Sequence, residues 1–457
     1  MTSFVVVGGG VAGLVAARTL AAGGADVILL EASDHLGGTV AHHTVGGLIL
    51  DAGAESFATR DGTVAALATE IGLGDEIVAP NPAAAWLQRP NGPVPLPATS
   101  LLGIPGIPAA NDVIAVVGTG TALRAYLEAL LPGPVGAKSK TLGELVRKRM
   151  GSGMLEKLVA PVAGGIHSAH PDTLDLDRVA PGLRKALINE GSLARAVQEL
   201  RANAPAGSAV LGIRGGVHRL VLELEADLQA LGVDVRLGQR VERVTIGSAV
   251  LANETIPGTI VVAAPNIAGA SERLSVALEP KRVTLATLVV DTPELDAAPR
   301  GSGVLVAEGA AGIVARALTH ATAKWQWLAD RAEGKHVLRL SYDPDRLART
   351  DLRDVARKDA AALLGISLSA PQVLDFARVD WTRAPTQGAA VDGVTLVGEA
   401  TSGTGLAAVI AQATAAARAL LEERAAAAAV PRADPDPGTR VDGDDPEGDV
   451  PPPSLAV

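Results

Sequence analysis

The sequence contains no cysteine, and this absence removes several kinds of chemistry. Disulfide bonds, iron–sulfur ligation and cofactors attached through a thioether all need cysteine sulfur, so none of them is available to this chain. Aromatic side chains are also scarce, with three Phe, two Tyr and four Trp among 457 residues. A cage of aromatic rings around a cationic substrate is therefore hard to build, because Tyr126 and Tyr342 are the only tyrosines.

Long apolar runs and an excess of basic charge are missing as well. No stretch of eighteen apolar residues occurs, so the sequence predicts no membrane-spanning helix. The first apolar strand is expected at Phe4, which leaves no room for a signal peptide, and we expect a cytoplasmic protein, at most peripherally attached to a membrane. The 40 basic and 50 acidic residues give a net charge of −10, which argues against nucleic-acid binding.

Half of that net charge lies at the C-terminal end of the chain. Val430–Val457 holds seven acids, two arginines and seven prolines, a net charge of −5. Such a composition cannot bury an apolar core, so we expect 425–457 to be a disordered, acidic, proline-rich tail.

The first glycine-rich loop has the pattern of a dinucleotide site. Phe4–Val7 is a short β-branched run that predicts a strand, and Gly8, Gly10 and Gly13 follow it as G-x-G-x-x-G. Gly8 permits a tight turn, Gly10 lets the backbone approach a pyrophosphate, and Gly13 lets a helix lie close to the strand.

A helix and an acid complete this pattern. The helix is expected to begin at Val11 and Ala12, where free N–H groups would face the pyrophosphate. A second apolar strand, Ala25 to Leu30, ends at Glu31, which is placed to accept hydrogen bonds from an adenosine ribose. The first sixty residues therefore predict dinucleotide binding.

Three further stretches resemble flavin motifs of the amine oxidase and protoporphyrinogen oxidase superfamily. Ala32–Thr39 resembles the second signature, with the glycine pair Gly37 and Gly38 and with His35 where Arg or Lys is usual. Gly47–Phe57 looks like the strand and loop beside the isoalloxazine ring, and Val394–Ala407 looks like the closing motif. The resemblance implies non-covalent FAD and assigns these residues to it: Gly8, Gly10, Val11, Ala12, Gly13, Glu31, Ala32, His35, Gly37, Gly38, Thr39, Gly53, Ala54, Glu55, Ser56, Val241, Trp381, Gly398, Glu399, Gly405, Leu406 and Ala407.

A series of weaker motifs narrows the resemblance to one group within this superfamily. They are Leu101–Gly106, Leu142–Val146, Ala160–His167, Gly191–Leu193, Gly212–Leu220, Gly303–Ala307, Lys324–Trp325 and Trp381. Together they resemble the bacterial oxygen-dependent coproporphyrinogen III oxidases, over nearly the whole chain from Thr2 to about Glu423. Relatives in this group suggest FAD-dependent oxidation of coproporphyrinogen III to coproporphyrin III in haem biosynthesis, with O2 as acceptor and H2O2 as product.

The same resemblance supplies the expected substrate contacts. Arg60 and Lys324 are expected to bind propionates, and the carbonyl of Gly165 to face pyrrole N–H groups. No catalytic side chain beyond the flavin and no metal site are expected, because the cofactor performs the chemistry. Expected partners are the porphyrinogen, O2 and either a membrane surface or another haem-pathway enzyme.

Several alternatives stay open. Protoporphyrinogen IX could be the substrate, and a flavin amine oxidase or a desaturase would share the FAD motifs. The stretch after Gln387 crosses directly to Val394 and is shorter than in relatives, so a flavin-binding relative with lost activity is a further alternative. A second nucleotide site at Gly118 and Gly120 is rejected, because Leu123 replaces the third glycine and no strand ending in an acid follows.

These motifs predict an α/β protein with a discontinuous FAD domain. We expect a Rossmann-like FAD-binding domain from 1–80, 208–268 and 374–424, because its motifs must meet at one cofactor. A helical domain is expected at 81–207 and a mixed-sheet substrate domain at 269–373. In the latter, strands are expected at Val283–Val290 and His336–Tyr342, and a helix from about Leu352 to Leu364.

Overall fold

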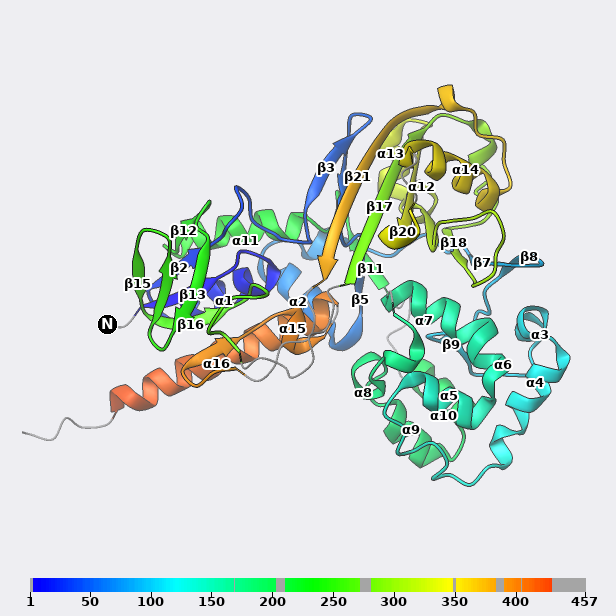
Figure 1. Cartoon of the computed structure of the whole chain (residues 1–457), viewed down its shortest axis with the longest axis horizontal. Coiled ribbons are helices and arrows are strands. Elements are labelled where there is room, and N and C mark those ends of the chain that lie inside the picture. The colour runs from blue at the N-terminus through cyan, green and yellow to red at the C-terminus, as the bar shows by residue number, and fades with distance from the viewer. Residues whose placement is uncertain are drawn as a thin grey trace, which may run out of the picture.

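The computed structural model describes residues 3–167, 169–202, 210–271, 281–347, 351–383, 390–403 and 405–429. The side chains of Arg60, His167, Lys281 and Arg383 lie outside this description, as does Val430–Val457, where the tail is expected. Three bodies make up the described part: a layered body at one end, a large mixed sheet, and a group of helices beside that sheet (Figure 1).

The layered body is built on a parallel sheet of short apolar strands. Its strand order is β12-β2-β1-β16-β22. The strands are β1 (Phe4–Val7), β2 (Val27–Leu30), β12 (Asp234–Arg236), β16 (Thr259–Val262) and β22 (Val394–Leu396). Because every neighbouring pair is parallel, the carboxyl ends of all five strands lie at one edge.

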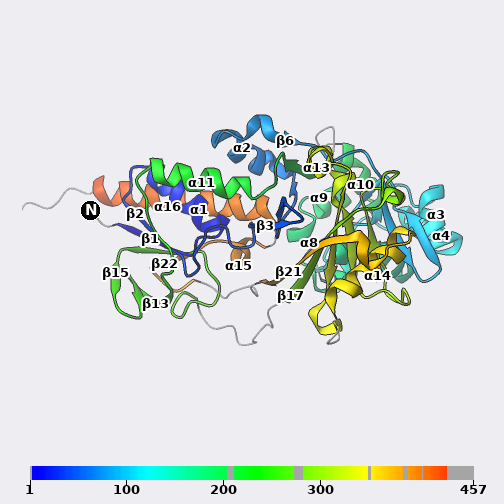
Figure 2. The same cartoon turned by 90° about the horizontal axis from the view of Figure 1, so that it is seen from above.

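Helices cover one face of this sheet and a small antiparallel sheet covers the other (Figure 2). The helices are α1 (Val11–Ala22), α2 (Thr63–Glu70), α11 (Arg219–Ala230) and α16 (Leu406–Ala429), with the short α15 (Glu399–Ser402) before α16. The small sheet holds β13 (Val241–Thr245), β14 (Ser248–Leu251) and β15 (Thr255–Pro257). The parallel strands are therefore buried on both faces, which explains why their sequences are continuously apolar.

The second body is a seven-stranded sheet with the order β21-β17-β20-β19-β18-β7-β8. Its strands are β7 (Ala85–Arg89), β8 (Gly92–Pro95), β17 (Lys281–Val290), β18 (Gly303–Val306), β19 (Ala317–His320), β20 (His336–Tyr342) and β21 (Val373–Arg383), and its helices are α12 (Ala321–Lys324), α13 (Gln326–Ala332) and α14 (Leu352–Leu364). The long strands β17 and β21 run from this sheet toward the layered body (Figure 1). They form the connection between the two bodies.

The third body is helical. It comprises α3 (Asn111–Val117), α4 (Thr119–Tyr126), α5 (Leu142–Met150), α6 (Ser152–Met154), α7 (Ala160–His167), α8 (Leu176–Val179), α9 (Leu183–Glu190) and α10 (Leu193–Ala202), with the short strands β9 (Ser100–Leu101) and β10 (Ile104–Pro105). The lookalike segment around Gly118 and Gly120 is helical, as expected, in α3 and α4. Within the described residues this stretch forms no strand before its glycines.

Smaller elements join the bodies. A hairpin of β3 (His42–Val45) and β4 (Leu48–Asp51) rises from the layered body beside β21 (Figure 1). Three short strands, β5 (Phe57–Ala58), β6 (Ile77–Val78) and β11 (Val210–Ile213), pair near the base of this hairpin.

Three expected boundaries differ from the structure. β7 and β8, which fall in the segment expected to be helical, extend the seven-stranded sheet. β21 belongs to that sheet too, although most of it was expected in the FAD domain. Helix α16 continues to Ala429, so 425–429 is helical and the tail cannot begin at 425.

Candidate functional site

The first glycine loop has the geometry that its sequence predicts. Gly8 adopts φ of +107°, and a Cβ on Gly13 would lie 1.9 Å from the Gly8 carbonyl oxygen, so only glycine fits there. A Cβ on Gly10 would meet nothing within 4 Å. Helix α1 begins directly after it, with Val11 and Ala12 buried in its first turn. The loop therefore presents open space at the amino end of a helix, where a phosphate is favoured.

The second glycine pair docks on this loop. Gly37 donates its N–H to the Gly9 carbonyl at 2.8 Å and forms an isolated parallel bridge with Gly10. Gly37 and Gly38 have φ of +107° and +59°. Gly38 and Thr39 are exposed beside Gly10, so the structure brings two motifs 27 positions apart into one surface.

Glu31 lies at the carboxyl end of β2 and reaches back to the same loop. One of its carboxylate oxygens accepts the Gly9 N–H at 2.6 Å, and the other accepts from the Ser33 N–H and hydroxyl, each at 2.8 Å. The acid that was expected to bind a ribose thus fixes the glycine loop.

The neighbours of Glu31 are more exposed. Ala32 and His35 are exposed, and the His35 ring nitrogen lies 2.7 Å from Asp34, which lowers the pKa of the Asp34 carboxyl. The backbone before Val241 runs beside Glu31, since Gln239 donates to the Glu31 carbonyl at 2.7 Å. The Val241 side chain itself is buried in the core below the sheet, so only its backbone could meet an adenine.

The C-terminal motif also meets the first helix. A Cβ on Gly398 would lie 3.2 Å from the Ala12 Cβ, and the Gly398 N–H donates to the Gln412 side chain at 3.0 Å. Glu399 follows as the first residue of α15. Gly405 has φ of +108° with open space at its Cβ position, directly before Leu406 and the buried Ala407 begin α16. The motif therefore contacts the first turn of α1 through Gly398, and α16 packs against α1 in the same core.

The loop between β4 and β5 links the layered body to the large sheet. A Cβ on Gly53 would lie 1.7 Å from the Thr39 carbonyl, so the loop packs tightly on the second glycine motif. From the other side, Trp381 of β21 donates its Nε1–H to the Ala52 carbonyl at 2.9 Å, and Arg339 of β20 donates to the Gly53 carbonyl. Ala54 and Ser56 are half-buried in the same loop.

Glu55 is the charged centre of this loop. Its carboxylate lies 2.7 Å from the Lys324 Nζ and 3.6 Å from the Arg339 Nη1. Burial acts to raise the pKa of Glu55, but the charges of Lys324 and Arg339 outweigh it and hold the pKa below its usual value. Glu55 is therefore ionised at neutral pH.

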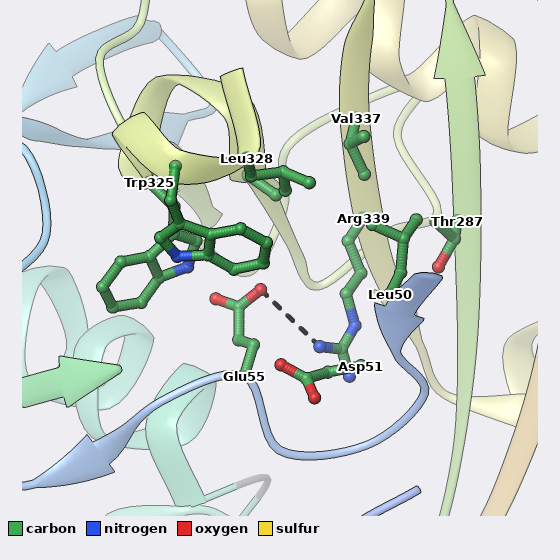
Figure 3. A pocket seen from close by; sticks show the side chains of 10 residues that line it. Leu50, Asp51, Glu55, Thr287, Trp325, Leu328, Val337 and Arg339 are labelled. Atoms are coloured by element: carbon green, nitrogen blue, oxygen red, sulfur yellow. Dashed lines mark ion pairs between the residues drawn. The ribbon is translucent and has the colours of Figure 1, made fainter. Parts of the chain in front are cut away.

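A pocket beside Glu55 is lined by side chains from both bodies. Figure 3 shows Glu55 and Arg339 pointing toward one another, with Trp325 and Leu328 above them. Asp51 also lines this pocket, and its carboxylate accepts from the Val217 N–H at 3.0 Å and the His218 N–H at 2.9 Å. It also lies 2.8 Å from the His218 ring, so its oxygens are engaged.

The three expected substrate contacts lie on separate elements, and only Lys324 contacts Glu55 within the described residues. Lys324 is the last residue of α12, and its ammonium group forms an ion pair with Glu55. Gly165 lies in α7 against Leu305 of β18, whose side chain would be 2.7 Å from an added Cβ. The backbone of Arg60 opens a short 3₁₀ turn, Arg60–Gly62, after the loop, and its side chain is outside the described residues.

The described residues fit a flavin dinucleotide. The open side of Gly10 and the helix start at Val11 lie beside Glu31, and together they form a cradle of backbone N–H groups and one acid. In the described part of the chain, no group of three His, Asp or Glu residues could hold a metal ion, and no helix is long and apolar enough to cross a membrane.

Comparison with known proteins identifies the family. Residues 11–421 match the flavin containing amine oxidoreductase family. The chain belongs to this family. It is therefore an oxidoreductase whose fold is built around a flavin cofactor.

Individual relatives of this oxidoreductase cover most of its length. A coproporphyrinogen III oxidase of Mycobacterium leprae is 31% identical over 393 residues, which are 80% of this chain and 84% of the relative. A coproporphyrinogen III oxidase of Propionibacterium freudenreichii is 27% identical, with 75% of this chain and 72% of the relative covered. A crystal structure from Exiguobacterium, described as a protoporphyrinogen oxidase, has a TM-score of 0.76 at 22% identity and covers 92% of this chain and 99% of its own. That structure shows that the fold is shared.

Two features of the site were not predicted from the sequence. Arg339 was predicted only as part of a strand. The contact between Asp51 and His218 was not predicted. The available signal was a charged residue among the apolar residues of Val337–Leu340, and its partner could not be deduced from the sequence.

Proposed function

We propose that this flavin oxidoreductase binds FAD non-covalently and oxidises a porphyrinogen, with coproporphyrinogen III as the preferred substrate. The observation that carries the cofactor is that Gly37 and Gly398, which are far apart in sequence, both lie against the start of α1, at Gly10 and Ala12 respectively. The lack of cysteine removes a thioether link to the flavin. The names of the two bacterial relatives support the substrate class.

The residues of this chain would bind and orient rather than exchange protons. When bound, FAD would supply the hydride-accepting chemistry that aromatises the macrocycle, with O2 as the terminal acceptor and H2O2 as product. The backbone N–H groups at the start of α1 would bind the pyrophosphate, and Glu31 the ribose. The 53–56 loop would lie along the ring, held in place from the sheet side.

The substrate contacts follow from charge. Lys324 and Arg60 are proposed to bind propionates, and the carbonyl of Gly165 to accept from pyrrole N–H groups. Because Lys324 already pairs with Glu55 at 2.7 Å, a propionate there would join or replace that pair. Coproporphyrinogen III carries four propionates and protoporphyrinogen IX carries two. Coproporphyrinogen III would therefore use more of these cationic contacts.

An aerobic assay tests this proposal. Purified protein is loaded with FAD and supplied in parallel with coproporphyrinogen III and protoporphyrinogen IX, while porphyrin fluorescence and peroxide are followed. We expect faster oxidation of coproporphyrinogen III, with peroxide formed. If flavin-loaded protein oxidises neither compound, the porphyrinogen proposal is wrong, and a flavin-binding relative with changed activity takes its place.

A further inference from the structure

Arg339 occupies an unusual position for an arginine. It lies on β20, a central strand of the seven-stranded sheet, between residues that are buried in the core. Its side chain is only 12% exposed. A guanidinium cannot be deprotonated in a protein, so this charge must be paired where it lies.

Both partners of Arg339 lie in the loop that follows β4. The guanidinium donates to the Gly53 carbonyl and lies 3.6 Å from the Glu55 carboxylate. It therefore contacts a backbone group and a side chain two residues apart, which suits a planar group with several fixed donors. The sequence separation of 286 residues between Arg339 and Gly53 makes this a link between distant parts of the chain.

On its other side, the same loop packs against the cofactor cradle. Gly53 contacts the Thr39 carbonyl, and the Ala52 N–H donates to the Ala41 carbonyl at 2.8 Å. Two residues before Thr39, Gly37 bridges to Gly10. A continuous series of backbone contacts thus leads from the glycine loop to the guanidinium of Arg339.

We propose that Arg339 is a positioning residue for the flavin: it holds the Gly53–Glu55 loop in the orientation that the bound ring requires. This inference rests on the proposed binding of FAD. Glu55 assists by keeping Arg339 and Lys324 together, and its lowered pKa is consistent with a permanently charged carboxylate between two cations. Without Arg339, the Gly53 carbonyl loses its donor while Glu55 keeps its pair with Lys324.

Two substitutions separate charge from geometry. Arg339→Met keeps an unbranched apolar stem but removes both the charge and the donors. Arg339→Lys keeps the charge but replaces the planar group with a single ammonium, which cannot reproduce both contacts in the same way. Arg316→Met serves as the matched control, because Arg316 pairs with Asp343 on the same sheet at an exposed position.

The measurements do not depend on substrate. For each protein we would determine the thermal midpoint without flavin, the dissociation constant for FAD, and the visible spectrum of the bound flavin. We expect Arg339→Met to weaken FAD binding at least tenfold and to shift the visible bands. Arg339→Lys should recover part of the affinity but not the wild-type spectrum, and Arg316→Met should match the wild type within twofold.

The outcomes are separable. If folded Arg339 variants bind FAD within twofold of the wild type with an unchanged spectrum, the positioning role is wrong. Should Arg339→Met fail to fold, Arg339→Lys decides the question by the same criteria. If the wild type itself does not bind FAD, the cofactor proposal fails instead. If the wild type binds FAD normally but oxidises no porphyrinogen, the proposed substrate is wrong, and the positioning role of Arg339 is still decided by FAD binding and the flavin spectrum.

Discussion

At the residue scale, the glycines of the cradle were the part of the site that sequence predicted best. Gly8 and Gly37 take φ of +107°, which other residues rarely adopt, and Gly13 has no room for a side chain. Both requirements, a positive φ and no room for a side chain, arise from the turn itself. The spacing of the glycines is therefore enough to predict them. Charged partners are different, because nothing near Arg339 in sequence indicates that it will meet Gly53 and Glu55.

Gly10 is the residue whose substitution should affect the cofactor without affecting the fold. A Cβ there meets nothing within 4 Å in the protein, so Gly10→Val should fill only the space that the pyrophosphate would use. We expect flavin content to fall nearly to zero while the thermal midpoint without flavin changes little. Gly120→Val is the matched control, because a Cβ on Gly120 also meets nothing within 4 Å. Full flavin content in Gly10→Val would show that the cradle has been misassigned.

His320 should make stability depend on pH. Burial, with a smaller effect from the charge of His336, lowers the pKa of His320 from 6.5 to about 4. The unfolded chain therefore binds this proton more tightly, so the stabilisation is complete above pH 6.5 and is lost as the pH falls toward 4. Each pKa unit corresponds to about 1.4 kcal/mol, which gives a loss of about 3 kcal/mol in the free energy of unfolding.

Denaturant titrations at pH 7 and pH 4.5 measure this dependence. The buried His320 Nε2 lies 3.2 Å from the His336 Nδ1, and His336 in turn lies 3.1 Å from Asp296. In His320→Gln the pH dependence should be smaller than in the wild type. The exposed His170 provides the control, and His170→Gln should keep the wild-type dependence. Equal pH dependence in all three proteins would contradict the assignment.

At the element scale, individual strands and helices were easier to predict than the pairing of strands in the sheets. The sequence placed a strand at His336–Tyr342 and a helix from about Leu352 to Leu364, and both were confirmed. β7 and β8 were missed as parts of the large sheet. β7 pairs in parallel with β18, more than two hundred positions later, and that pairing leaves no local pattern in the sequence.

A buried ion pair holds several elements of the helical body together. Arg149 of α5 lies 2.7 Å from Glu128, and both side chains are at most 1% exposed. Glu128 also accepts the Ala194 N–H at 3.0 Å, in the first turn of α10. The pair therefore fixes the start of one helix against the end of another.

Removing one partner should be costly. Glu128→Gln would leave the Arg149 guanidinium buried without a counter-charge, and such a loss costs about 3–5 kcal/mol of unfolding free energy. The exposed pair of Glu144 and Lys148 offers the control, and Glu144→Gln should lower the free energy of unfolding far less than Glu128→Gln does. Urea unfolding measures both variants. Similar losses in the two would mean that burial of the Glu128 pair does not matter.

At the scale of the whole molecule, the proposed cofactor site is assembled from segments that are distant in sequence. The described chain contributes the loops at Gly8–Gly13 and Gly37–Glu55, the stretch before Val241, and the turn at Gly398. Sequence predicted that these segments meet, because one dinucleotide requires it. The contacts from the large sheet to the loop at Gly53 were beyond prediction, since they depend on how the two bodies pack against each other.

This packing predicts that FAD stabilises both bodies together. All four tryptophans, Trp86, Trp325, Trp327 and Trp381, lie in the body of the large sheet, so their fluorescence reports its unfolding. FAD at one hundred times its dissociation constant should add about 2.7 kcal/mol to the stability of whatever unfolds with its site. If Arg339 and Trp381 couple the bodies through the 52–55 loop, the midpoint from tryptophan fluorescence should rise with FAD and coincide with the release of flavin. In Arg339→Met the two midpoints should separate, whereas in Arg316→Met they should stay together. If the unfolding midpoint from tryptophan fluorescence does not change with FAD in the wild type, the two bodies unfold independently. The 52–55 loop would then transmit no stability between them.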